Sequence, residues 1–120
     1  MLYQLFDSIK QRPAFFLNQQ SVVGLHSFLL GFQTAKKMYQ LPEDDDERDF
    51  AGFQEWVAKR YNVQTGQGWP RIIDFFARDD RDSLDLFFKL LEAYKNRSLP
   101  VYASTQTDDS EDEILEYMVK

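Results

Sequence analysis

Apolar residues recur three or four positions apart in five separate segments of this 120-residue sequence. That spacing puts the apolar side chains on one face of a helix. The first segment shows it with Leu2, Leu5, Phe6 and Ile9, and Pro13 ends the segment because a proline disfavours helical geometry in the residue before it. We therefore predict an all-α fold, a compact bundle of about five helices. The expected helices cover about residues 2–12, 21–39, 49–61, 69–76 and 83–95.

The second of these helices carries two kinds of line along its surface. Its apolar stripe is made of Val22, Leu25, Leu29, Phe32 and Ala35. A second line consists only of small residues, Gly24, Ser27 and Gly31. Each glycine inside a helix costs about 1 kcal/mol relative to alanine, so the small line needs a compensating contact. We expect a neighbouring helix to pack closely against it, which would make this helix the central one.

A glycine-rich stretch, QTGQGWP, precedes the fourth helix. A phosphate-binding loop would follow a strand and carry a lysine, whereas this stretch follows a helix and has neither feature. We interpret it as a turn in which Gly66 and Gly68 adopt positive φ and end the third helix. Pro70 suits the first turn of the next helix, and Trp69 begins the apolar face of that helix. Trp69 is therefore predicted to be a core residue.

The chain divides into a helical domain, residues 1–103, and an acidic C-terminal segment, residues 104–120. The stretch LPVYASTQT has the alternation of a strand, but one strand has no sheet to join, so we expect an extended arm. Near the end of the chain, Ile114, Tyr117 and Met118 have the spacing of a short helix.

Charge is distributed unevenly along the chain. The net charge of −6 is the sum of −5 in residues 43–49, −5 in residues 108–120 and +4 in the remainder. Both acidic segments would repel phosphate groups, so we expect no direct nucleic-acid ligand.

The acidic segment, residues 43–49, is the candidate partner-binding site. Its carboxylates are Glu43, Asp44, Asp45, Asp46, Glu47 and Asp49. The segment lacks the central glycine of a calcium-binding loop, so no metal site is predicted. Two interpretations stay open: a solvated loop whose later acids begin a helix, or a surface for a basic protein partner. In either case, replacing the acids at positions 44–46 with asparagine should leave the fold intact.

Little in the sequence points to catalysis. There is no cysteine, which excludes thiol catalysis and zinc–thiolate sites. His26 is the single histidine, and the adjacent Ser27 cannot face it on a helix, so we interpret His26 as a packing residue. No catalytic residue, cofactor or metal is predicted, although paired carboxylates could still support acid–base chemistry.

Three phenylalanine doublets, at positions 15–16, 75–76 and 87–88, exceed what a narrow helix stripe can bury. We expect some of these rings to reach the surface, as in a binding patch.

Residues 52–94 read GFQEWVAKRYNVQTGQGWPRIIDFFARDDRDSLDLFFKLLEAY. A helix with a WV pair, a GW..II turn and an FF.LL helix make this stretch resemble small uncharacterised bacterial proteins that are similar to immunity proteins of polymorphic toxin systems. The resemblance implies a helical fold and a role as an inhibitor. An acidic protein of that kind would occlude a basic toxin such as a nuclease, with carboxylates in the cationic groove meant for phosphates.

We therefore predict a non-enzymatic protein-binding module, best interpreted as an immunity protein. The alternatives are a regulatory or adaptor protein with another basic partner and, less favoured, a carboxylate-dependent enzyme. The N-terminus lacks the basic start, the apolar core and the cleavage site of a signal peptide, and the most apolar window, residues 21–32, is too short to span a bilayer. We expect a soluble, cytoplasmic protein with no membrane contact.

Overall fold

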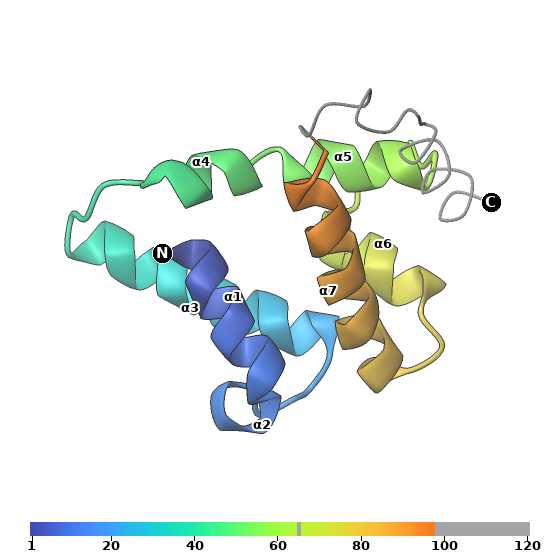
Figure 1. Cartoon of the computed structure of the whole chain (residues 1–120), viewed down its shortest axis with the longest axis horizontal. Coiled ribbons are helices and arrows are strands. Elements are labelled where there is room, and N and C mark those ends of the chain that lie inside the picture. The colour runs from blue at the N-terminus through green and yellow to red at the C-terminus, as the bar shows by residue number, and fades with distance from the viewer. Residues whose placement is uncertain (65, 98–120) are drawn as a thin grey trace.

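The computed structural model describes residues 1–64 and 66–97, and these residues form seven helices with no strand among them (Figure 1). The predicted all-α class is confirmed. The helices are α1 (Leu2–Gln11), α2 (Pro13–Phe16), α3 (Val22–Met38), α4 (Asp45–Phe50), α5 (Phe53–Arg60), α6 (Trp69–Phe76) and α7 (Asp80–Lys95). The predicted arm and the acidic segment 104–120 lie outside the described residues, so they stay predictions.

The seven observed helices differ from the expected five in two places. The apolar connection after Pro13 forms the short α2, because that proline occupies its first turn. The predicted third helix is two helices, α4 and α5, separated at Ala51 and Gly52. A Cβ atom on Gly52 would lie 2.7 Å from the Tyr94 hydroxyl oxygen, so α7 packs against the backbone at this break.

One aromatic cluster joins α4, α5, α6 and α7. The ring of Phe53, which is fully buried, lies 5.3 Å from Trp69 and 5.7 Å from Phe87 between centroids. Trp69 is buried, as predicted, and its backbone N–H donates to Gln54 Oε1 at 2.6 Å. The buried apolar residues in contact with this cluster include Leu2, Phe6, Ile9, Val22, Leu25, Leu29, Val57, Ile73, Leu84, Leu90, Leu91 and Tyr94.

The ends of α3 and α5 have the same cap. At α3, Gln40 has φ 57°, and Leu41 N–H donates to Lys36 O. At α5, Asn62 has φ 53°, and Val63 N–H donates to Ala58 O. Both are Schellman caps in which a non-glycine residue adopts the left-handed conformation. The predicted role of Gly66 and Gly68 is therefore wrong, since no glycine in the described part of the chain has positive φ.

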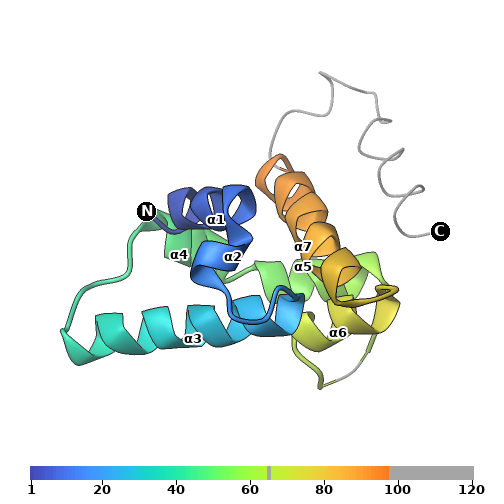
Figure 2. The ribbon, with the colours of Figure 1, turned by 90° about the horizontal axis from the view of Figure 1, so that it is seen from below.

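The helix α3 is peripheral rather than central. It lies along one edge of the molecule, with α1, α2 and α4 on the same side of it (Figure 2). Ser27, Gly31 and Ala35 are exposed, and a Cβ atom on Gly31 would meet nothing within 4 Å. Only Gly24 is tightly covered, by the Gln19 backbone of the preceding connection. The expectation of a helix packed along the small line is therefore wrong.

Candidate functional site

The acidic segment begins a helix instead of forming a loop. The Asp44 side chain accepts a hydrogen bond from Glu47 N–H at 3.0 Å, and Glu47 Oε1 accepts one from Asp44 N–H at 2.9 Å. This reciprocal pair is a capping box, which fixes the first turn of α4. The helix starts at Asp45, four residues before the predicted start at Asp49. The sequence signal for this start is the three-residue spacing of Asp44 and Glu47, which apolar periodicity does not detect.

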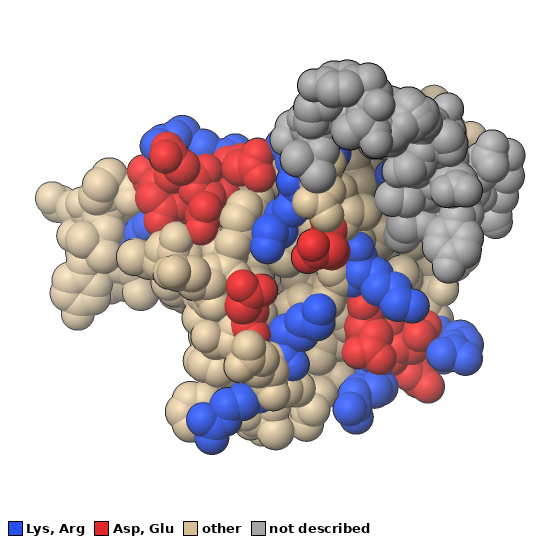
Figure 3. Space-filling view, viewed as in Figure 1, with Lys and Arg blue, Asp and Glu red and all other residues tan. Residues whose placement is uncertain are grey.

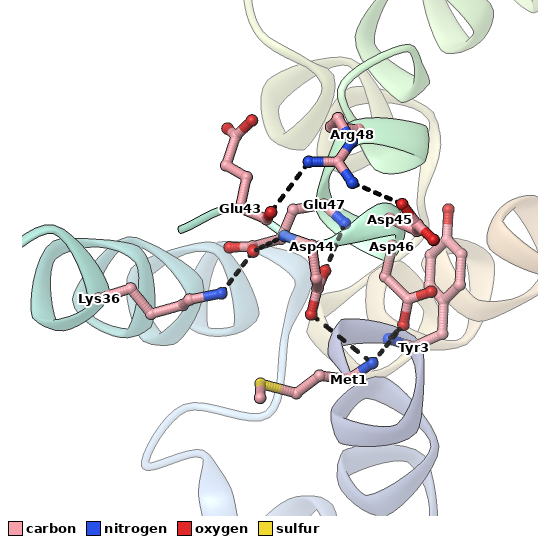
Figure 4. A network of polar contacts seen from close by, with 9 residues as sticks. All are labelled: Met1, Tyr3, Lys36, Glu43, Asp44, Asp45, Asp46, Glu47 and Arg48. Carbon is pink, nitrogen blue, oxygen red and sulfur yellow. Dashed lines mark hydrogen bonds and ion pairs between the residues drawn. The ribbon is translucent and has the colours of Figure 1, made fainter. Parts of the chain in front are cut away.

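Asp46 ties the start of α1 to α4 (Figure 4). Its Oδ2 atom lies 2.7 Å from the N-terminal ammonium of Met1 and accepts a hydrogen bond from Tyr3 N–H at 3.0 Å. The pKa of Asp46 is lowered, mainly by the hydrogen bond from the ammonium group and then by the Tyr3 amide. The carboxylate therefore has an internal structural role.

Glu47 is the most deeply placed acid of the segment. Its Oε1 atom lies 2.5 Å from Lys36 Nζ on α3, and the two side chains are only 9% and 11% exposed. The same oxygen accepts the capping bond from Asp44 N–H, so one carboxylate caps α4 and binds α3 (Figure 4). A charge in this position is stabilised because its counterion is held beside it.

Asp49 joins three elements that are far apart in the sequence. It accepts hydrogen bonds from the Tyr3 hydroxyl at 2.6 Å and from Arg97 at 2.7 Å. The pKa of Asp49 is lowered, first by the Arg97 guanidinium and then by the Tyr3 hydroxyl. Burial and the bond to Asp49 raise the pKa of Tyr3. The backbone carbonyl of Asp49 also accepts a hydrogen bond from the Tyr94 hydroxyl.

Two carboxylates of the segment remain directed to solvent. The Asp45 side chain is 97% exposed and pairs with Arg48 at 2.5 Å, and Glu43 is exposed. Together with its bound cations, which are the N-terminal ammonium, Lys36, Arg48 and Arg97, the acidic segment carries −2. Figure 3 shows acidic side chains grouped over α4.

These contacts change the expectation that asparagine at positions 44–46 would leave the fold intact. Replacement of Asp46 with asparagine removes an ion pair, so the triple substitution at positions 44–46 would perturb the fold as well as the surface. Asp44 and Asp46 lie beside the Met1 ammonium, whereas Glu47 pairs with Lys36 on α3 and Asp49 pairs with Arg97, which follows α7. In residues 1–64 and 66–97, no group of three or more potential ligands is placed to hold a metal ion.

A second exposed surface lies on α6. Phe75 and Phe76 are 79% and 46% exposed, and they border an open groove of about 410 Å³ that Val63 and Arg71 also line. The ring of Tyr61 stacks on Phe76 with 4.4 Å between centroids. The doublet at 87–88 is buried, whereas Phe15 is 71% exposed. The prediction that part of the aromatic content reaches the surface is confirmed.

His26 packs edge-on against Trp69 with 5.6 Å between ring centroids. Partial burial lowers its pKa. The next residue, Ser27, is exposed and does not face the His26 ring, which agrees with the interpretation of His26 as a packing residue.

Comparison with known protein families, curated proteins and solved structures finds no match to this chain. Among the helices of the described residues, none combines the length and the apolar character that crossing a membrane requires.

Proposed function

We propose that this protein is a non-enzymatic protein-binding module whose partner is basic, in the manner of an immunity protein that occludes a toxin. The observation that carries the proposal is the fixed acidic surface of α4. The capping box and the bonds of Asp46 and Asp49 hold this helix in place, so Glu43 and Asp45 are presented from a rigid support. A preorganised surface loses less conformational entropy on binding.

The residual charge decides what the surface can contribute. A local charge of −2 attracts a basic protein and raises its association rate, but salt screens it over about 8–10 Å. Strong affinity would need an apolar anchor as well. The exposed Phe75 and Phe76 provide aromatic side chains of the kind that dominates binding energy at interfaces.

The alternatives make different demands on the site. An adaptor would use the same surface for another basic partner, and a toxin gene directly upstream would favour the immunity role. An enzyme using a general acid at neutral pH would need a carboxylate with a raised pKa. The pKa values of Asp46, Asp49 and Asp82 are all lowered by hydrogen bonds and ion pairs within the chain, which is the opposite of what a general acid needs.

The test compares two double variants that change the net charge equally. Glu43→Gln with Asp45→Asn neutralises the solvent-facing acids at the start of α4 and removes the Asp45–Arg48 ion pair, but it leaves the capping box and the bonds of Asp46 in place. Glu55→Gln with Asp85→Asn neutralises exposed acids on α5 and α7 and serves as the control. The partner is recovered by affinity capture from the native host, and its association rate is then measured between 50 and 300 mM salt.

We expect the α4 variant to slow association several-fold and to flatten its salt dependence, because the steering charge is gone. The control should change both quantities much less. Equal effects of the two variants would mean that net charge, and not this surface, guides the partner, and an acidic partner would refute the proposal.

A further inference from the structure

One face of α3 is exposed over four turns, and Lys37 at its edge carries the only charge among its exposed residues. Its members are Val23, Ser27, Leu30, Gly31, Thr34, Ala35 and Met38. Val23, Leu30 and Met38 are 39%, 48% and 75% exposed, and residues 22–35 contain no aspartate, glutamate, lysine or arginine. A helix on the surface of a monomer normally turns charged and polar residues to the solvent. This face is therefore suited to contact with another surface.

The order of residues on this face is self-complementary. The 17-residue helix has its midpoint at Leu30, and a two-fold axis between positions 30 and 31 would relate two antiparallel copies. At each level along such a pair, a residue of one copy lies beside its counterpart in the other. The levels pair Leu30 with Gly31, Ser27 with Thr34, and Val23 with Met38. A self-complementary patch of this kind is what a two-fold interface requires.

Size and chemistry also match across these levels. Leu30 lies beside Gly31, where open space replaces a side chain, and the smaller Val23 lies beside the longer Met38. Ser27 and Thr34 bring two hydroxyl groups together, and each can donate and accept a hydrogen bond. The open space over Gly31 lets the two backbones approach closely near the axis.

Charge favours the antiparallel direction. Glu47 of the acidic segment pairs with Lys36 in the C-terminal part of α3, so antiparallel copies place their two acidic segments toward opposite ends of the helix pair. The two Lys36 positions would lie about 16 Å apart along the helices at 1.5 Å per residue, which exceeds the screening length of about 8–10 Å. A parallel pair would set the two negative segments side by side and align the two helix dipoles unfavourably.

We infer that this face of α3 binds a second copy of the chain in an antiparallel, two-fold dimer. The inference names another occupant than the basic-partner proposal, although Leu30 and Thr34 line a groove that Glu43 also lines. One helix pair covers less than the roughly 800 Å² per partner of a standard interface, so the dimer is weak, with a dissociation constant on the order of 10 μM. Tyr39 and Leu41, which are 78% and 55% exposed, extend the apolar surface beyond the helix end.

Sedimentation velocity between 1 and 500 μM tests the dimer. The unsubstituted chain should shift from monomer to dimer across this range. Leu30→Glu places a charge at the axis and should abolish the shift, whereas Phe75→Glu, which changes an exposed apolar residue on α6, should not. Circular dichroism of both variants verifies that they stay folded. A chain that is monomeric at 500 μM, or a dimer that survives Leu30→Glu, overturns the inference.

Oxidative cross-linking tests the direction of the pair and does not depend on Leu30. Because the chain has no cysteine, an introduced cysteine can form a disulfide only with another introduced cysteine. Ser27→Cys combined with Thr34→Cys should give a cross-linked dimer, since these positions face each other between antiparallel copies. Each single variant should cross-link at least several-fold less, because identical residues lie about 10 Å apart along the axis. Efficient cross-linking of Ser27→Cys alone would show a parallel pair and overturn the assignment.

Discussion

The Lys36–Glu47 pair offers the sharpest test of how α4 is held against α3. The two side chains are 11% and 9% exposed, and their charged atoms are 2.5 Å apart. Lys36→Met keeps the length of the side chain and removes its charge, which leaves the Glu47 carboxylate in a nearly dry position without its counterion. Removal of one partner of a buried pair costs about 3–5 kcal/mol. Because a tenth of each side chain still meets solvent, we expect the lower end, about 3 kcal/mol.

The second single variant and the double variant separate the ion pair from the capping role. Glu47→Gln keeps an acceptor for Asp44 N–H, since glutamine also completes a capping box. It should cost less than Lys36→Met, because the lysine ammonium can turn toward solvent. The double variant, Lys36→Met with Glu47→Gln, has no unpaired charge and should recover to within about 1 kcal/mol of the original chain. The coupling energy of the cycle is then at least about 2 kcal/mol.

The assay is urea unfolding followed by far-UV circular dichroism, with thermal unfolding as a second measure. A loss of 3 kcal/mol should lower the midpoint temperature by about 12 °C or more in a domain of this size. Lys59→Met is the matched control, because Lys59 pairs with Glu55 at 3.8 Å in a site that is 78% exposed, and it should leave the midpoint unchanged. If the double variant is as unstable as Lys36→Met, the pair is not coupled and the reasoning is refuted.

Three further predictions use the same unfolding assay. Trp69→Ala should lower the unfolding free energy by about 3–5 kcal/mol, since the ring is 92% buried in the aromatic cluster, and an unchanged value would contradict its core role. Gly24→Ala should destabilise the chain because its Cβ would lie 1.9 Å from the Gln19 carbonyl oxygen, whereas Gly31→Ala should stabilise the monomer by up to about 1 kcal/mol; the opposite order would refute the packing described for α3. Asp49→Asn should lower the unfolding free energy by about 1 kcal/mol at pH 7, a modest value because the Asp49 side chain is 39% exposed. Because the folded pKa of Asp49 is lowered, its contribution is present above the unfolded pKa of about 3.9 and is lost as pH falls below it, so the variant and the original chain should converge in acid.

Much of the fold follows from local signals in the sequence. Ser21 was predicted to begin the second helix, and its side chain accepts the Gly24 N–H as an N-cap. Trp69 and Pro70 open α6 as expected. These features depend on residues within a few positions of each other, so periodicity and capping rules can predict them.

The remaining features depend on contacts between distant residues. The break between α4 and α5 is set by the Tyr94 hydroxyl, which lies more than forty residues later in the chain. The peripheral position of α3 could not be read from Gly24 and Gly31, since one is covered by backbone and the other is open. For the candidate site, the sequence identified the carboxylates but not their cations, because only the fold brings Lys36 and Arg97 to them.

The bonds of Asp49 have a consequence for when the protein becomes competent during its synthesis. The carboxylate of Asp49 binds Arg97, and its backbone carbonyl binds the Tyr94 hydroxyl. Both hydrogen bonds therefore require the last turn of α7 and the residues after it. A ribosome adds about 5–20 residues per second, so Asp49 is added about 2–10 s before Arg97. Until then the nascent chain carries the acidic sequence without its finished shape. A growing chain therefore offers a partner the charges of α4 first and their complete arrangement only after Tyr94 and Arg97 have been added.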